Sequence, residues 1–125
     1  MKATKKLIVI GDRVLIELDE SRERTTAGLY LPPTVKEKEK IQCGHIVKVG
    51  PGYPVSDPNA VADEPWVSKK REDLKYIPLQ AAEGDYAIFL KDAAVEIEFE
   101  GKKYLIVPHS AVLALVRTEL AESDE

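Results

Sequence analysis

Short apolar runs, separated by turn-forming residues, constrain the fold of this chain more than any other feature. Each run is rich in Val, Ile, Leu or Phe, as β-strands are. No run keeps the 3.6-residue period of an amphipathic helix over a longer stretch. The expected strands are Leu7–Leu18, Ile41–Val49, Tyr86–Leu90, Val95–Phe99, Tyr104–Val107 and Val112–Val116. For 125 residues this pattern predicts one all-β domain, a small barrel or sandwich.

Three parts of this pattern allow more specific structural predictions. The residues after Asp12 are apolar with few interruptions, which predicts a strand covered on both faces, with a bend at Gly11. Glu100-Gly101-Lys102 predicts a tight hairpin, because Gly101 can adopt a positive φ. Val112–Val116 fits a strand or a short buried helix, and its length favours the strand.

The segment Ser21–Gln42 is mostly charged or small, but its middle holds three large apolar residues. Gly28 precedes this triplet of Leu29, Tyr30 and Leu31, and Pro32-Pro33 follows it. Connections in compact domains are usually about 4–6 residues long, and much longer ones are often functional. We therefore expect a mobile loop at about residues 20–40 whose triplet is buried in another protein. The alternative is an ordinary strand that folds onto its own barrel.

The segment Tyr53–Pro78 shows neither helical nor strand periodicity and predicts a long inserted loop. It contains four prolines and the only tryptophan, Trp66. The residues expected to anchor it are Tyr53, Val55, Trp66, Tyr76 and Ile77. Prolines and aromatic residues favour an ordered cap over a flexible linker.

Charge and composition exclude several classes of function. The net charge is −4, and the basic clusters are interleaved with or followed by acidic residues, so we expect no nucleic-acid partner. The apolar run near the N-terminus is too short for a signal peptide, and no run approaches the length of a membrane span. Cys43 is the only cysteine, which fits a reducing compartment. We expect a cytoplasmic protein with no membrane partner.

The residues that could carry chemistry have simpler interpretations. His45 and His109 are isolated histidines with no HxxxH motif and no cysteine cluster, so we expect no metal site. Cys43 is interpreted as a small core residue, because a nucleophile needs a base that the sequence does not place. Glu96, Glu98 and Glu100 alternate with apolar residues, which favours a solvated strand face over acid–base catalysis. No catalytic residue is predicted.

Several motifs, taken in order, resemble the GroES family, the small co-chaperonins that cap a large chaperonin ring. Gly11-Asp12-Arg13-Val14 is similar to the N-terminal strand of that family, and Thr26–Pro32 is similar to its mobile loop. The strand and turn of Gly44–Gly52, the Gly84–Leu90 strand and the C-terminal run Tyr104–Val116 follow in the same order. The resemblance covers Leu7–Pro51 and Glu83–Arg117.

This resemblance implies a GroES-like β-barrel protomer, a homo-oligomeric ring, expected to be a heptamer, and binding to a GroEL-type chaperonin. It assigns Gly28, Leu29, Tyr30 and Leu31 to contact with the chaperonin. It places ATP on that partner, so no cofactor is expected here. The segments that it assigns to the interface between subunits are Leu7, Ile8, Val9 and Ile10, and Val112, Leu113, Leu115 and Val116. The insertion Tyr53–Pro78 stands where the family has a short hairpin at the roof of the ring.

Two other classes of protein share part of this pattern. A β-barrel module could use its long loops to bind proteins without any chaperonin. The GroES-like domain of zinc alcohol dehydrogenases would require several Cys or His ligands and a dinucleotide-binding domain with its GxGxxG motif. One cysteine, 125 residues and no such motif argue against the enzyme.

Overall fold

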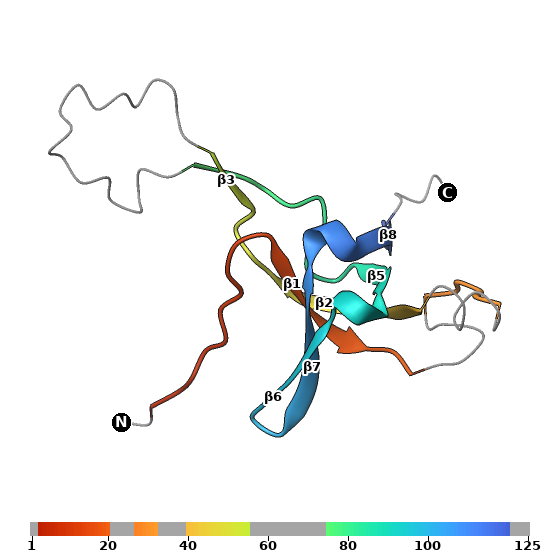
Figure 1. Ribbon diagram of the computed structural model, residues 1–125, viewed down its shortest axis with the longest axis horizontal. Helices are drawn as coiled ribbons and strands as arrows, with labels where there is room; N and C mark the ends of the chain where they lie inside the picture. Colours follow the sequence, from red (N-terminus) through yellow and green to blue (C-terminus); the bar gives the residue numbers. More distant parts are fainter. Residues whose placement is uncertain (1–2, 21–26, 33–39, 56–74, 121–125) are drawn as a thin grey trace, which may run out of the picture.

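A computed structural model describes residues 3–20, 27–32, 40–55 and 75–120 of this chain, which form an all-β structure (Figure 1). Within these ranges there are eight strands and two 3-10 helices, and no α-helix. The strands are β1 (Arg13–Leu18), β2 (Ile41–Val49), β3 (Tyr53–Val55), β4 (Lys75–Ile77), β5 (Tyr86–Leu90), β6 (Val95–Phe99), β7 (Lys102–Pro108) and β8 (Val112–Val116). The 3-10 helices are η2 (Lys91–Ala93) and η3 (His109–Ala111).

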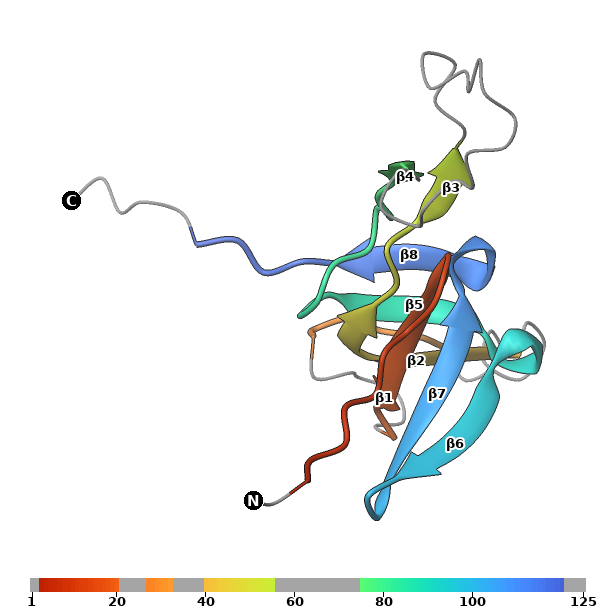
Figure 2. The same ribbon diagram turned by 90° about the vertical axis from the view of Figure 1, so that its left-hand side faces the viewer.

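Six strands form one antiparallel sheet in the order β6-β7-β1-β2-β5-β8. The register shifts between Leu15 and Ile16 on β1 and between Ile88 and Phe89 on β5. Such irregularities bend a strand and increase its twist. Figure 2 shows the result: β5 and β8 run across the direction of β1 and β7, so the sheet is strongly curled. The predicted all-β class and small GroES-like barrel are confirmed.

The main hydrophobic core lies on the inner face of the curled sheet. Its buried members are Val14, Ile16, Ile46, Ala81, Ala87, Phe89, Leu105, Val107 and Ala111. Side chains alternate between the two faces of a strand, so Leu15 points away from its neighbours Val14 and Ile16. Leu15 is nevertheless only 2% exposed, which confirms that β1 is covered on both faces.

The hairpin between β6 and β7 forms as predicted. Phe99 pairs with Lys102, which leaves Glu100 and Gly101 as a two-residue loop. Both loop residues have positive φ, 50° and 78°, as the favoured type I′ hairpin requires.

The prediction of one strand over Leu7–Leu18 is wrong in its N-terminal half. β1 begins at Arg13, and residues 3–10 belong to no strand. Gly11, with φ 67°, turns the chain just before β1. Lys48 Nζ donates a hydrogen bond to the carbonyl of Leu7 at 2.8 Å and thereby holds the segment near β2. The apolar sequence favours an extended chain, but a strand also needs a neighbour to pair with.

The prediction that Tyr53–Pro78 is a loop throughout is corrected at both of its ends. β3 and β4 pair as an antiparallel ribbon, in which Tyr53 lies opposite Ile77. The ribbon stands at the end of the molecule opposite the β6–β7 hairpin (Figures 1 and 2). Four of the five expected anchors lie in this ribbon, whereas Trp66 falls outside the described residues.

Candidate functional site

The apolar triplet lies in the connection between β1 and β2, of which residues 27–32 are described. Gly28 is exposed, has a φ of 83° and has open space where a side chain would stand. Tyr30 is 54% exposed and forms a single β-bridge. Gly28 and Tyr30 therefore present an accessible backbone and an accessible aromatic ring to any partner.

Leu29 and Leu31 behave differently from Tyr30. Both are half-buried and pack against a second hydrophobic cluster, formed by Cys43, Tyr86 and Ile88. In the single chain the two leucines therefore contact their own barrel, whereas Tyr30 does not join this cluster. For them the alternative, packing on the barrel, is nearer to what is observed. The parts of the predicted mobile loop at residues 21–26 and 33–39 lie outside the described residues.

The two ends of this loop are anchored to the sheet. At the first end, Asp19 donates its backbone N–H to the carbonyl of Cys43 at 2.9 Å and accepts a hydrogen bond from the Tyr86 hydroxyl at 2.7 Å. At the second end, the carbonyl of Lys40 accepts a hydrogen bond from the N–H of Lys91 at 2.7 Å. The Lys40 ammonium also lies 3.6 Å from the Asp92 carboxylate. The triplet is therefore presented from a fixed base.

The predicted subunit interface consists of segments with exposed apolar side chains. Ile8 and Ile10 of the N-terminal segment are 68% and 73% exposed, while Leu7 and Val9 are half-buried. On β8, Leu113 is 53% exposed, and Val112, Leu115 and Val116 are half-buried. Within the described sheet β8 is an edge strand that pairs with β5 alone. These segments thus combine apolar surface with an open strand edge.

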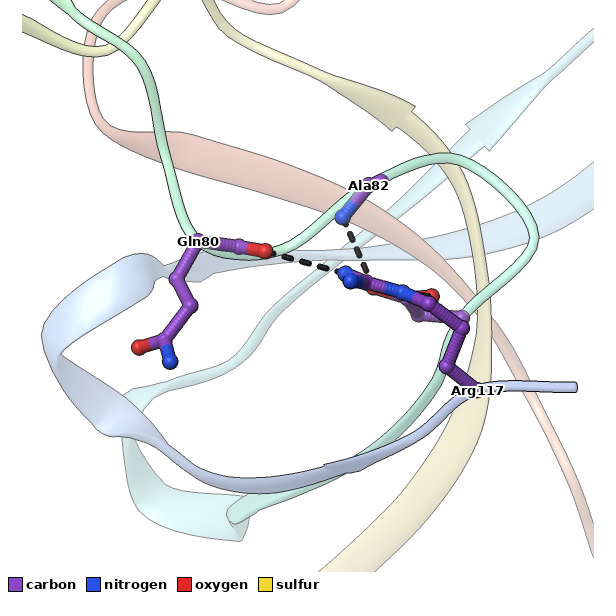
Figure 3. A network of polar contacts seen from close by, with 4 residues as sticks. Gln80, Ala82 and Arg117 are labelled. Atoms are coloured by element: carbon purple, nitrogen blue, oxygen red, sulfur yellow. Dashed lines mark hydrogen bonds and ion pairs between the residues drawn. The ribbon is translucent and has the colours of Figure 1, made fainter. Parts of the chain in front are cut away.

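An ion pair between the buried Asp85 and the partly exposed Arg117 fixes the end of β8. Both Nε and Nη2 of Arg117 donate hydrogen bonds to the Asp85 carboxylate, at 2.7 and 2.6 Å. Arg117 Nη2 also donates to the carbonyl of Gln80, and the N–H of Ala82 donates to Asp85 Oδ2 at 2.8 Å. Figure 3 shows Arg117 extending from the end of β8 to the turn that holds Gln80 and Ala82. The hydrogen bonds from Arg117 hold the pKa of Asp85 below its ordinary value, although burial opposes this effect.

Sequence reasoning did not find this ion pair, although one signal was available. Asp85 directly precedes β5, and Arg117 directly follows β8. Because Tyr86 pairs with Val116 in the antiparallel register, the next residues outward on each strand face one another. Opposite charges at those two positions predict the pair once β5 and β8 are known to be neighbours.

The remaining candidate residues fit structural roles. Cys43 is buried, His45 packs edge-on against the ring of Tyr86 at 4.9 Å, and His109 Nδ1 lies 3.0 Å from the Tyr53 hydroxyl. Glu96, Glu98 and Glu100 are exposed, which confirms the solvated face. In the described ranges no three His, Cys, Asp or Glu side chains gather in a way that could hold a metal ion.

One pocket, of about 400 Å³, opens between the end of β1 and the β6–β7 hairpin. Its lining contains charges of both signs. Lys102 lies 3.3 Å from Glu17, and Lys103 lies 3.9 Å from Glu96. The described lining holds three acidic residues, Glu17, Glu20 and Glu96, and three basic ones, Lys91, Lys102 and Lys103, so it carries no excess of one charge.

The geometry defines a small β-barrel that presents an apolar loop and apolar edge segments, which is the character of a protein-binding subunit. Comparison with known proteins agrees. The chain matches the family described as "Chaperonin 10 Kd subunit" over residues 6–64 and 66–116. The chain belongs to this family.

Within its described part, no helix has the length and apolar character needed to cross a membrane.

Three bacterial relatives, each named co-chaperonin GroES, illustrate the similarity. The protein of Halalkalibacterium halodurans is 38% identical over 107 residues, which cover 86% of this chain and 95% of the relative. The protein of Geobacillus kaustophilus is 37% identical over 108 residues, covering 86% of this chain and 97% of the relative. The protein of Bacillus velezensis is 39% identical over 107 residues, covering 86% and 95%.

Proposed function

We propose that this chain is a co-chaperonin that caps a GroEL-type chaperonin and assists protein folding. The observation that carries the proposal is the family match over both halves of the barrel, together with the apolar triplet between β1 and β2. Gly28, Leu29, Tyr30 and Leu31 make the contact with the chaperonin. Support comes from the exposure of Gly28 and Tyr30 and from the fixed base on which the loop stands.

Simple energetics favours many weak contacts over one strong contact. Fully burying a side chain the size of Leu or Tyr contributes roughly 1.5–3 kcal/mol, so the triplet contributes at most roughly 9 kcal/mol, and less because Leu29 and Leu31 are already half-buried. Ordering the backbone opposes this by about 1–2 kcal/mol for each residue that becomes fixed. Pro32 lowers this cost because its φ is already restricted in the free loop. One loop therefore binds weakly, and a ring of loops binds tightly because each later contact is effectively intramolecular.

The proposed ring forms by contact between the N-terminal segment of one subunit and β8 of its neighbour, and is expected to contain seven subunits. Ile8, Ile10 and Leu113 are large apolar residues with more than half of their surface exposed in the single chain. The edge of β8 can accept a further strand, and residues 7–10, which belong to no strand in the single chain, are proposed to supply one. Association would bury both sets of side chains.

In this proposal the chain is not an enzyme and needs no cofactor, because ATP is bound and hydrolysed by the chaperonin. A cytoplasmic location is proposed with it, supported by a single cysteine that forms no intrachain disulfide. The insertion at about residues 53–78 forms part of the roof of the ring, supported by the position of the β3–β4 ribbon at one end of the barrel (Figure 2).

Native mass spectrometry with a GroEL-type chaperonin, with and without ATP, tests the proposal. We expect a complex of one ring of this protein with the chaperonin, formed only when nucleotide is present. Tyr30→Ser is expected to weaken the complex at least tenfold without changing the mass of the free ring. A protein that forms no such complex, with or without nucleotide, is a β-barrel binding module of another kind.

A further inference from the structure

The strand β5 is buried on both faces, although only one face belongs to the main core. Ala87 and Phe89 point into that core, whereas Tyr86 and Ile88 point to the outer face of the curled sheet. On the neighbouring strand β2, Cys43 lies opposite Ile88 and joins the same outer cluster. All three outer residues are buried: Cys43 is 3% exposed, Tyr86 2% and Ile88 8%.

The outer face of a sheet becomes buried only where another segment covers it. The segments that pack on this cluster contribute Ala27, Leu29, Leu31, Ile41 and Val116. Ile41 and Val116 belong to β2 and β8, which lie beside the cluster in the same sheet. Among the described residues, the cover from outside the sheet therefore comes from the loop, through Ala27, Leu29 and Leu31. Tyr30 lies between the two leucines and remains 54% exposed.

We propose that Cys43, Tyr86 and Ile88 form an intramolecular docking site for Leu29 and Leu31, here called the loop seat. The site holds the recognition triplet on its own barrel until a partner competes for it. The competition rests on the proposed function, because the same two leucines are assigned to the chaperonin. The docking itself does not rest on that function.

Anchors at the base of the loop favour this arrangement. Asp19 binds both to the Tyr86 hydroxyl and to the carbonyl of Cys43, so two of the three residues of the loop seat also hold the first end of the loop. A loop tied beside an apolar surface meets that surface at a high effective concentration. The anchored base therefore favours contact of Leu29 and Leu31 with this surface.

Self-docking has a defined consequence for binding. The apparent affinity of the triplet for a partner is lowered by the fraction of molecules in which the leucines are released. When the leucines leave, the loop seat becomes exposed to solvent. A change in the exposure of Cys43 therefore reports directly on the position of the loop.

The rate of alkylation of Cys43 by iodoacetamide tests the docking, because Cys43 is the only cysteine of the chain. Burial slows this reaction by excluding the reagent from the thiol. We expect Leu29→Ser combined with Leu31→Ser to raise the rate at least tenfold. Tyr30→Ser, the control from the middle of the same triplet, is expected to leave it within twofold. Equal rates for the double variant and the unaltered protein, or an equal increase in Tyr30→Ser, would overturn the proposal.

A second pair of variants separates release of the loop from damage to the barrel. Leu29→Met with Leu31→Met keeps an apolar cover and is expected to react at the rate of the unaltered protein. The single variants Leu29→Ala and Leu31→Ala are expected to give intermediate rates. All rates are measured at a temperature at which circular dichroism shows the full folded signal. Rapid alkylation of the methionine variant would mean that the leucines do not act as an apolar cover, and the proposal would fail.

Binding to the chaperonin distinguishes failure of this inference from failure of the proposed function. Ile88→Ala loosens the loop seat without altering the triplet, so it is expected to tighten binding to an ATP-loaded chaperonin about threefold. Unchanged affinity in a folded Ile88→Ala protein would refute the competition. If Cys43 responds as expected but no chaperonin binds, the loop seat stands and the proposed function fails. If the chaperonin binds but the alkylation rate of Cys43 does not change, the proposed function stands and the loop seat fails.

Discussion

Asp85 is the only charged side chain that is fully buried among the described residues, and its carboxylate oxygens both accept hydrogen bonds. It accepts two hydrogen bonds from Arg117 and one from the N–H of Ala82. A buried carboxylate is costly unless it is paired and hydrogen-bonded, as this one is. The pair ties the end of β8 to the turn before β5. Its main structural effect is therefore to hold the edge strand on which the proposed ring contact depends.

Replacing Asp85 by Asn is expected to lower the free energy of unfolding by about 1–3 kcal/mol, because Arg117 loses its charged acceptor. Urea unfolding of the barrel measures the loss. Glu83→Gln, an exposed acidic residue of the same turn, is the control and is expected to have little effect. A loss no greater than that of the control would show that the ion pair contributes nothing.

The contribution of Asp85 should also depend on pH. Its pKa is lowered in the folded protein, so the unfolded chain takes up the proton first as pH falls. The stabilisation is fully present above the ordinary aspartate pKa of about 3.9 and is lost as pH falls through the folded value. The difference in stability between the unaltered protein and Asp85→Asn should therefore shrink below about pH 4. A difference that stays constant down to pH 2 would contradict this assignment.

Two elements of the chain are incomplete in one subunit. β8 has one unpaired edge within the described sheet, and the segment of residues 7–10 is apolar but belongs to no strand. An exposed strand edge is a ready site for pairing with another chain. In the proposed ring, residues 7–10 of one subunit pair with the free edge of β8 in its neighbour.

A charge on the edge strand is expected to prevent assembly of the ring. Leu113→Lys would place an ammonium group in the proposed apolar contact, and burying an unpaired charge is strongly unfavourable. Native mass spectrometry should find monomers that retain the circular dichroism spectrum of the barrel. Leu120→Lys, at an exposed leucine that follows β8, is the control and should leave the ring intact. Intact rings of the Leu113→Lys protein would place the subunit interface elsewhere.

The β3–β4 ribbon is the second element whose role depends on its surroundings. An isolated two-stranded ribbon is only marginally stable, and Tyr53, Val55, Tyr76 and Ile77 of this one are exposed in the single chain. The hydrogen bond between Tyr53 and His109 connects it to η3. Contacts with neighbouring ribbons at the roof would add the missing stabilisation.

Removal of the insertion tests its role in the ring. Replacing residues 53–78 by a short turn is expected to lower the resistance of the ring to dissociation and to proteolysis. A variant that lacks only residues 56–74 retains the ribbon and serves as the comparison. If both variants match the unaltered protein in ring mass, protease resistance and chaperonin binding, the insertion is passive.

For the molecule as a whole, tight binding is expected to come from repetition of a weak contact. A peptide of residues 21–42 carries the triplet but lacks both the anchored base and the ring. It should bind an ATP-loaded chaperonin orders of magnitude more weakly than the intact protein, because ordering costs offset most of the apolar gain. Calorimetry or competition with labelled ring measures both affinities. Comparable affinities would show that one loop is sufficient and that symmetry adds little.

Much of the fold and part of the site could be predicted from local sequence. Strands β2, β5, β6 and β8 have the bounds that the apolar runs predict, and the β6–β7 hairpin turns at Glu100 and Gly101 as expected. These features depend on alternation and on positive φ, both of which are encoded by neighbouring residues. The apolar triplet was also found by local contrast, since three large apolar side chains stand out in a charged segment.

Tertiary structure decided what depends on residues far apart in the chain. β1 starts at Arg13 rather than Leu7, and a ribbon forms between Tyr53–Val55 and Lys75–Ile77. Leu29 and Leu31 pack on a cluster contributed by β2 and β5. Asp85 meets Arg117 only because β5 and β8 are neighbours. By itself the sequence determined which segments are extended and apolar. Which of them pair, and which apolar surface covers another, was decided by the curling of the sheet, because burial depends on distant segments brought together.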